Sequence, residues 1–243
     1  MNRLARVLIL MLAAPLYAQD VIVFPFLQPN TPQAGAYGSM WLTRLTVFND
    51  TGVARLVGLD CAGICGARVT VAPGETRTLS FGGSGFRLTG DQANLQYRLR
   101  AFDVSRLASS LGVEIPVMRS VDFADSVQLL DLATSPGYRT SLRIYSFRGV
   151  PVGRETVTVR ISIFDEDGSL WREELMDLLP FSPTPYLELH SIERDLLAGA
   201  PATVRVEVAS AMEPDDFGGF PIYAFATTTN NESQEVTLTT PAR

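Results

Sequence analysis

The residues of this chain that could carry out chemistry are His190, Cys61, Cys65 and a set of scattered carboxylates. His190 is the only histidine, so a Ser-His-acid triad would have to use it. No Gly-x-Ser-x-Gly turn between a strand and a helix is present to hold a nucleophilic serine. Two distant carboxylates could hydrolyse a glycoside, but the sequence singles out no pair. We therefore predict a protein without enzymatic activity and keep a hydrolase using His190 or a carboxylate pair as one alternative.

The two cysteines, Cys61 and Cys65, are separated by three residues. A zinc site needs about four ligands, and the redox motif needs two intervening residues, so neither fits this pair. In an oxidising compartment the thiols can form a small disulfide that closes a loop. The acidic segments 165–168 and 213–219 fill only part of the calcium-loop pattern and are typical of solvated turns. We predict a structural disulfide between Cys61 and Cys65, no metal and no cofactor.

The first 18 residues are typical of a secretory signal peptide. Arg3 and Arg6 precede an apolar run over 7–14, and the small Ala18 precedes the expected cleavage. The apolar run is much shorter than the roughly 20 residues that a membrane-spanning helix needs. We expect an exported protein, periplasmic or extracellular, whose mature chain starts at Gln19 and has no transmembrane segment.

The charge of the chain limits the class of partner. The formal net charge is −6, and removal of the two leader arginines takes it to −8. An acidic balance of this kind argues against nucleic acid and against an anionic membrane surface. We expect a protein or polysaccharide partner in the cell envelope or extracellular space.

The elements that would position any functional residue are β-strands, and some of them occur twice. Segment 41–48 reappears as 138–145 with residue character kept at nearly every alternate position, and 99–102 reappears as 222–225. Alternation with a period of two predicts strands at 21–27, 41–49, 54–59, 68–71, 76–81, 94–102, 113–117, 127–132, 138–146, 156–164, 170–172, 185–190, 203–209, 220–228 and 235–239. A short helix is predicted at 191–197 with Ser191 as its cap.

The repeat divides the 243 residues into a signal peptide, 1–18, and two related modules, 19–124 and 125–243. No Pro/Ser-rich linker separates the modules, so we expect them to pack against each other.

Arginine and aromatic residues recur on the faces opposite the apolar ones. If Leu45 and Val47 point into the core, Arg44 and Phe48 point outward. The same alternation adds the other candidates, Arg98, Arg100, Phe102, Arg143, Tyr145, Arg160 and Phe164. Guanidinium groups and flat rings suit sugars, uronic acids and peptide strands, so these nine residues are a candidate binding platform. The alternative, which we favour, is a solvated sheet face whose aromatic residues cover the junction between the modules.

Segments 138–145, 112–117 and 222–227, followed by Asn230 and Asn231, resemble those of a recurrent kind of exported bacterial protein with tandem immunoglobulin-like modules. The resemblance implies an all-β chain of two tandem immunoglobulin-like antiparallel β-sandwich domains, with a role in adhesion, scaffolding or accessory binding.

These observations together predict a non-enzymatic exported binding or structural protein that recognises its partner through β-sandwich surfaces. A carbohydrate-binding accessory module is the first alternative, ahead of the hydrolase. It requires the large aromatic side chains to form an exposed flat patch, namely Trp41, Trp171, Phe48, Tyr145 and Phe164.

Overall fold

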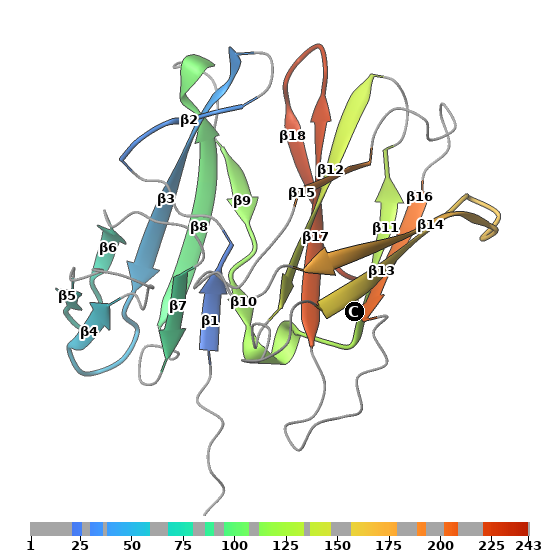
Figure 1. Cartoon of the computed structure of the whole chain (residues 1–243). Coiled ribbons are helices and arrows are strands. Elements are labelled where there is room, and N and C mark those ends of the chain that lie inside the picture. Colours follow the sequence, from blue (N-terminus) through green and yellow to red (C-terminus); the bar gives the residue numbers. More distant parts are fainter. Residues whose placement is uncertain are drawn as a thin grey trace, which may run out of the picture.

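In the computed structural model, the described residues are 21–25, 30–35, 38–58, 68–79, 86–89, 95–106, 112–133, 137–146, 157–178, 189–192, 202–208 and 221–242. This part of the chain is all-β, with strands in several antiparallel sheets (Figure 1). Its helical turns are the 3-10 segments Val104–Arg106 (η3) and Ser120–Asp122 (η4). The predicted all-β class with antiparallel sheets is confirmed.

In the first half of the chain, β3 and β8 form the central pair of the largest sheet. Its order is β2-β3-β8-β9, and β6 pairs with β3 on the same side as β2, at the other end of the strand. A second sheet has the order β10-β1-β7, and β4 pairs with β5. The strands are β1 Val21–Phe24, β2 Gln33–Ala34, β3 Met40–Phe48, β4 Arg55–Gly58, β5 Arg68–Val71, β6 Thr76–Leu79, β7 Phe86–Thr89, β8 Gln96–Asp103, β9 Val113–Ile115 and β10 Met118–Arg119.

In the second half, eight strands form two four-stranded sheets. One has the order β11-β16-β13-β14 and the other β15-β12-β17-β18. The strands are β11 Ser126–Leu132, β12 Tyr138–Ser146, β13 Val157–Phe164, β14 Leu170–Leu178, β15 Leu189–Ile192, β16 Ala202–Val208, β17 Ile222–Asn230 and β18 Val236–Thr239.

The strand orders of the two halves correspond. The path β6-β3-β8-β9 matches β15-β12-β17-β18, and the pairs β1-β7 and β4-β5 match β11-β16 and β13-β14. The segments that repeat in the sequence lie on β3, β8, β12 and β17, the central pair of each sheet. The register differs, since Leu45 is opposite Leu99 whereas its counterpart Leu142 is opposite Ala226 and not Ile222. This offset of four residues is even, so the same faces stay inward.

The core of the second half, called the second cluster here, lies between its two sheets. Leu129, Ile161 and Ile163 come from one sheet, and Leu142 and Ile144 come from the other. Because these side chains alternate along their strands, each sheet presents one apolar face to the other.

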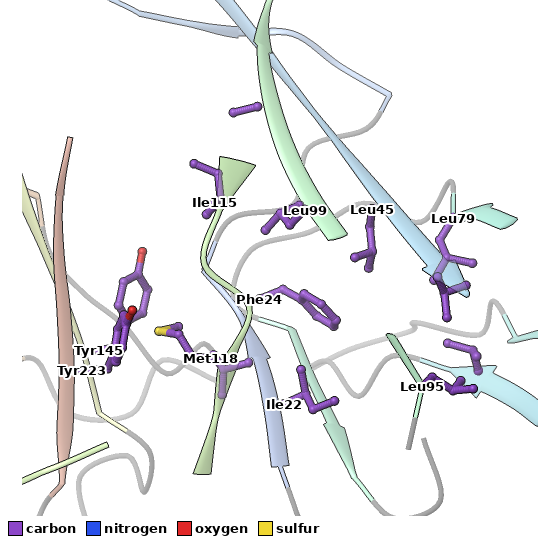
Figure 2. Packing of buried hydrophobic residues seen from close by; sticks show 14 of the residues in the cluster. Ile22, Phe24, Leu45, Leu79, Leu95, Leu99, Ile115, Met118, Tyr145 and Tyr223 are labelled. Carbon is purple, nitrogen blue, oxygen red and sulfur yellow. The ribbon is translucent and has the colours of Figure 1, made fainter. Parts of the chain in front are cut away.

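A larger cluster of buried residues, called the first cluster here, extends over both halves. It combines residues of the first half such as Phe24, Leu45 and Leu99 with Tyr145, Tyr223 and Phe225 of the second. The rings of Tyr145 and Phe225 stack nearly parallel, with centroids 5.7 Å apart. The ring centroids of Phe123 and Tyr223 are 5.9 Å apart. Figure 2 shows Met118 beside Tyr145 and Tyr223.

Strand β17 and the end of β12 are therefore buried on both faces of the sheet β15-β12-β17-β18. On β12, Leu142 and Ile144 belong to the second cluster, and Tyr145 belongs to the first. On β17, Ala224 belongs to the second cluster and Phe225 to the first. The expected packing of the two halves against each other is confirmed.

The backbone also joins the halves. Ala124 and Ile222 exchange two hydrogen bonds, with N···O distances of 2.9 and 2.7 Å. Strand β9 lies alongside β18 (Figure 1). These contacts place the segment after β10 against the start of β17.

Asn49 connects three segments at the end of β3. Its side chain is fully buried. Nδ2 donates to the carbonyl oxygens of Val53 and Val71, both at 2.9 Å. Oδ1 accepts from the backbone N–H of Thr51 at 3.0 Å and from the Thr51 hydroxyl at 2.6 Å. The amide therefore fixes the backbone at Thr51, Val53 and Val71 to the end of β3, and its bond to the Val71 carbonyl satisfies a buried acceptor.

Tyr97 is partly buried and packs against the first cluster. Its ring meets that of Phe24 edge to face, with centroids 5.4 Å apart. Burial raises the pKa of the Tyr97 phenol, and the positive charge of Arg119 opposes this effect to a smaller extent.

The predicted helix cap at Ser191 is wrong. Ser191 lies in β15, where it is opposite Ser141 of β12. Pairing with a long neighbouring strand prevails here over the local preference of serine for a helix start. Residues 1–18, Cys61, Cys65 and 213–219 lie outside the described residues, so the signal peptide, the disulfide and the second acidic turn stay predictions.

No helix in the described part of the chain is long and apolar enough to span a membrane.

Candidate functional site

The outward side of the first sheet carries the densest group of predicted site residues. Thr43, Leu45 and Val47 of β3 are buried, and so are Leu99 and Ala101 of β8, so the residues between them face away from the core. We call this surface the arginine face; it consists of Leu42, Arg44, Thr46, Phe48, Gln96, Arg98, Arg100, Phe102 and Glu114. Five of the nine predicted binding residues lie on it: Arg44, Phe48, Arg98, Arg100 and Phe102.

Phe102 lies at the centre of an arginine pair. Arg44 and Arg100 are directly opposite each other on β3 and β8. The Cζ atom of Arg44 is 4.9 Å from the centroid of the Phe102 ring, and that of Arg100 is 5.9 Å from it. Both guanidinium groups are therefore within the range of cation–π attraction.

Gly112, directly before β9, lies against the Phe102 ring. Its φ is +72°, and a Cβ atom there would lie 2.6 Å from the Ala101 carbonyl oxygen and 2.7 Å from Cδ1 of Phe102. The ring thus lies where a side chain at position 112 would be, and this close approach requires glycine.

The charges on the arginine face are not balanced. Arg98 binds Glu114 through Nη2 at 2.7 Å and through Nε at 2.8 Å, both to Oε2. Glu114 is opposite Arg100 in the register, yet its carboxylate pairs with Arg98. Within the described residues, no carboxylate forms an ion pair with Arg44 or Arg100, and the buried Nε of Arg100 has no hydrogen-bond partner. The arrangement can accept a planar anion, because guanidinium groups bind carboxylates with paired hydrogen bonds.

The other predicted site residues do not join this surface. Tyr145 points away from the second cluster as predicted, but it is 2% exposed because it lies in the first cluster. Tyr145 therefore does not lie on an exposed surface; it lies in the cluster that the two halves share. Arg143 is half-buried on β12. Arg160 pairs with Glu173 at 3.6 Å, and Phe164 is half-buried at the end of β13.

The five aromatic residues needed for a carbohydrate platform are dispersed. Trp41 packs against the first cluster and donates from Nε1 to the Ser39 hydroxyl at 3.0 Å. Trp171 packs against the second cluster. With Tyr145 buried as well, these residues form no common flat patch.

Sequence reasoning missed Gly112 and Glu114 as parts of the site. Glu114 was on a predicted edge strand, but only the pairing of β9 with β8 brings it to Arg98. A glycine directly before a short edge strand is the one signal that marks a close approach of another group.

The residues considered for catalysis and metal binding do not form a second site in the described part of the chain. The backbone of His190 pairs with Leu142, and its side chain lies outside the described residues. No group of three or more His, Cys, Asp or Glu side chains that could hold a metal occurs in the ranges that the structure describes. Oδ1 of Asp165 accepts the backbone N–H groups of Asp167 and Ser169 at 3.1 and 2.8 Å, which confirms the turn predicted at 165–168.

Comparisons of the chain with protein-family models, with curated proteins and with solved structures found no match. Its function is therefore argued from its own residues.

Proposed function

We propose that this is a non-enzymatic exported protein with a binding or structural role, which recognises its partner through the arginine face. The observation that carries the proposal is the pair Arg44 and Arg100, which lies over Phe102 without a carboxylate partner in the described residues. A sheet face that served only as a solvated surface would gain stability from a carboxylate between these arginines. Glu114 is opposite Arg100 in the register, but its carboxylate pairs with Arg98.

The proposal includes two tandem immunoglobulin-like β-sandwich modules, 19–124 and 125–243. It is supported by the corresponding strand orders of the two halves and by the repeated central pairs. In immunoglobulin domains the first two strands share one sheet, whereas β11 and β12 lie in different sheets here. The likeness is therefore to the two-sheet architecture and not to the strand order, as in several sandwich families.

The site favours protein recognition over carbohydrate binding. Sugar-binding platforms use exposed rings, and Trp41, Trp171 and Tyr145 pack against or inside the two clusters. The ring of Phe102 has a guanidinium over it. What the face offers is charge and an open, regular surface.

The experiment that tests the proposal is a binding screen of purified residues 19–243 against arrays of peptides and glycans. Phe102→Ala removes the ring that both arginines contact. Leu175→Ala is the matched control, because Leu175 is 64% exposed on β14 in the other half. We expect saturable binding that Phe102→Ala weakens and Leu175→Ala does not, with both variants folded by circular dichroism. Equal binding by all three proteins, or turnover of an arrayed compound, would contradict the proposal.

A further inference from the structure

We infer that the arginine face binds the carboxylate groups of an acidic polypeptide, with Arg44 and Arg100 as the residues that hold them. This inference rests on the proposed function and adds the chemistry of the partner.

The cross-strand position of the two arginines is the first argument. Side chains directly opposite each other on antiparallel strands have Cβ atoms about 4.5–5.5 Å apart, and like charges at that spacing destabilise the sheet. Arg44 and Arg100 occupy such a position. A carboxylate between them would remove the repulsion and could accept hydrogen bonds from both guanidinium groups.

Glu114 is the second argument. Its carboxylate lies on the arginine face beside β8, and Arg98 engages it with two short contacts. Arg98 is therefore neutralised, whereas the charges of Arg44 and Arg100 are moderated by the Phe102 ring alone among the described contacts. Of the three arginines, only Arg98 is paired with a carboxylate in the described residues. Arg44 and Arg100 are left to bind an external anion.

The shape of the surface is the third argument, and it favours a polypeptide over an acidic sugar. A uronic acid polymer gains much of its affinity by stacking sugar rings on aromatic side chains. The Phe102 ring has Arg44 on it and Gly112 against it, so it offers little area for stacking. An acidic peptide needs no such ring, because its carboxylates and backbone can lie across a flat sheet face.

The test measures affinity by calorimetry for residues 19–243 with three probes. These are a Gly/Ser-rich peptide with spaced glutamates, the same peptide with glutamines, and polygalacturonate. The variants are Arg44→Gln and Arg100→Gln, with Arg77→Gln as the matched control, because Arg77 is an exposed arginine outside the arginine face that pairs with Glu75. Hydrogen bonds to charged groups contribute enough that each of the first two variants should lose about tenfold or more in affinity. Arg77→Gln should lose much less.

Stability gives an independent readout. An arginine kept for folding would lower the urea midpoint when replaced, whereas Arg44→Gln should leave it unchanged or raise it, because it relieves repulsion. Moderate salt should stabilise the wild type more than Arg44→Gln, because salt screens exposed like charges.

The outcomes separate the inference from the proposed function. Glutamate-dependent binding that Arg44→Gln and Arg100→Gln weaken, and that Arg77→Gln leaves unchanged, supports both the inference and the proposed function. Preference for polygalacturonate, or equal losses in all three variants, overturns the acidic-peptide inference. Binding of the glutamine peptide that Phe102→Ala abolishes also overturns it, but leaves the proposed function standing. Absence of binding to every peptide and glycan overturns both.

Discussion

Replacing Tyr145 by alanine is expected to destabilise both halves of the molecule, although the residue belongs to the second. Its ring is 2% exposed and stacks on Phe225 within a cluster made mostly of first-half residues. A buried aromatic side chain removes roughly 150–250 Å² from water, and at about 25 cal/mol per Å² this contributes about 4–6 kcal/mol. The unfolded chain already shields part of that surface, so we expect a loss of about 3–5 kcal/mol in the free energy of unfolding.

The two tryptophans make the assay specific for each half. Trp41 packs against the first cluster and Trp171 against the second. Urea unfolding is followed by fluorescence in a Trp171→Phe background, which leaves Trp41, and in a Trp41→Phe background, which leaves Trp171. In the parent proteins both probes should report the same midpoint, because the sheet between the clusters is common to them. Tyr145→Ala should lower both midpoints.

The control is Leu175→Ala, an exposed position on β14, which should change the free energy of unfolding by less than about 0.5 kcal/mol. Two well-separated transitions in the parent proteins would refute the coupling. A Tyr145→Ala variant that shifts the Trp171 signal and leaves the Trp41 signal in place would refute the assignment of Tyr145 to the first cluster.

Three further perturbations follow from the described contacts. Asn49→Leu should cost about 1–3 kcal/mol in urea unfolding, because it removes the side-chain hydrogen bonds to Thr51, Val53 and Val71, of which the one to the Val71 carbonyl is buried; a loss below about 0.5 kcal/mol would contradict this role. The raised pKa of Tyr97 means that the stability it contributes is full below about pH 10 and falls as the pH rises further, since the unfolded chain releases the phenolic proton first. Tyr97→Phe should flatten the free energy of unfolding measured against pH in this range, and an unchanged slope would count against it. Gly112→Ala should cost about 1–3 kcal/mol, measured in urea, because a left-handed φ strains alanine. It should also weaken ligand binding by displacing Phe102, and a variant that binds as tightly as the wild type would disagree with that placement.

Much of the strand pattern could be predicted from the sequence, because alternation of apolar and polar residues is a local property. Segments 68–71 and 138–146 match β5 and β12 at both ends, and 156–164 matches β13 within one residue. Strands β2, β7 and β10 were not predicted, and they have two to four residues each. Such short strands depend on their neighbours and carry almost no periodic signal.

The burial of outward faces could not be predicted in the same way. Alternation along β12 puts Ile144 and Tyr145 on opposite faces of the strand. Only the packing of the first half against the second decides that the face of Tyr145 is covered. One signal was present in β17, where Ile222, Tyr223, Ala224 and Phe225 are apolar on both faces. For the arginine face, the sequence identified the arginines and Phe102, whereas the separate pairing of Arg98 depends on the register between β8 and β9.

The burial of β17 on both of its faces also affects the order in which the molecule can be completed during synthesis. The first cluster needs Tyr223 and Phe225, which the ribosome adds about 200 residues after Ile22 of the same cluster. Until β17 emerges, the apolar edge of the first half has no cover and must stay open or be shielded by another protein. A chain stalled before residue 222 should therefore remain a substrate for chaperones and proteases even though its first half is fully synthesised.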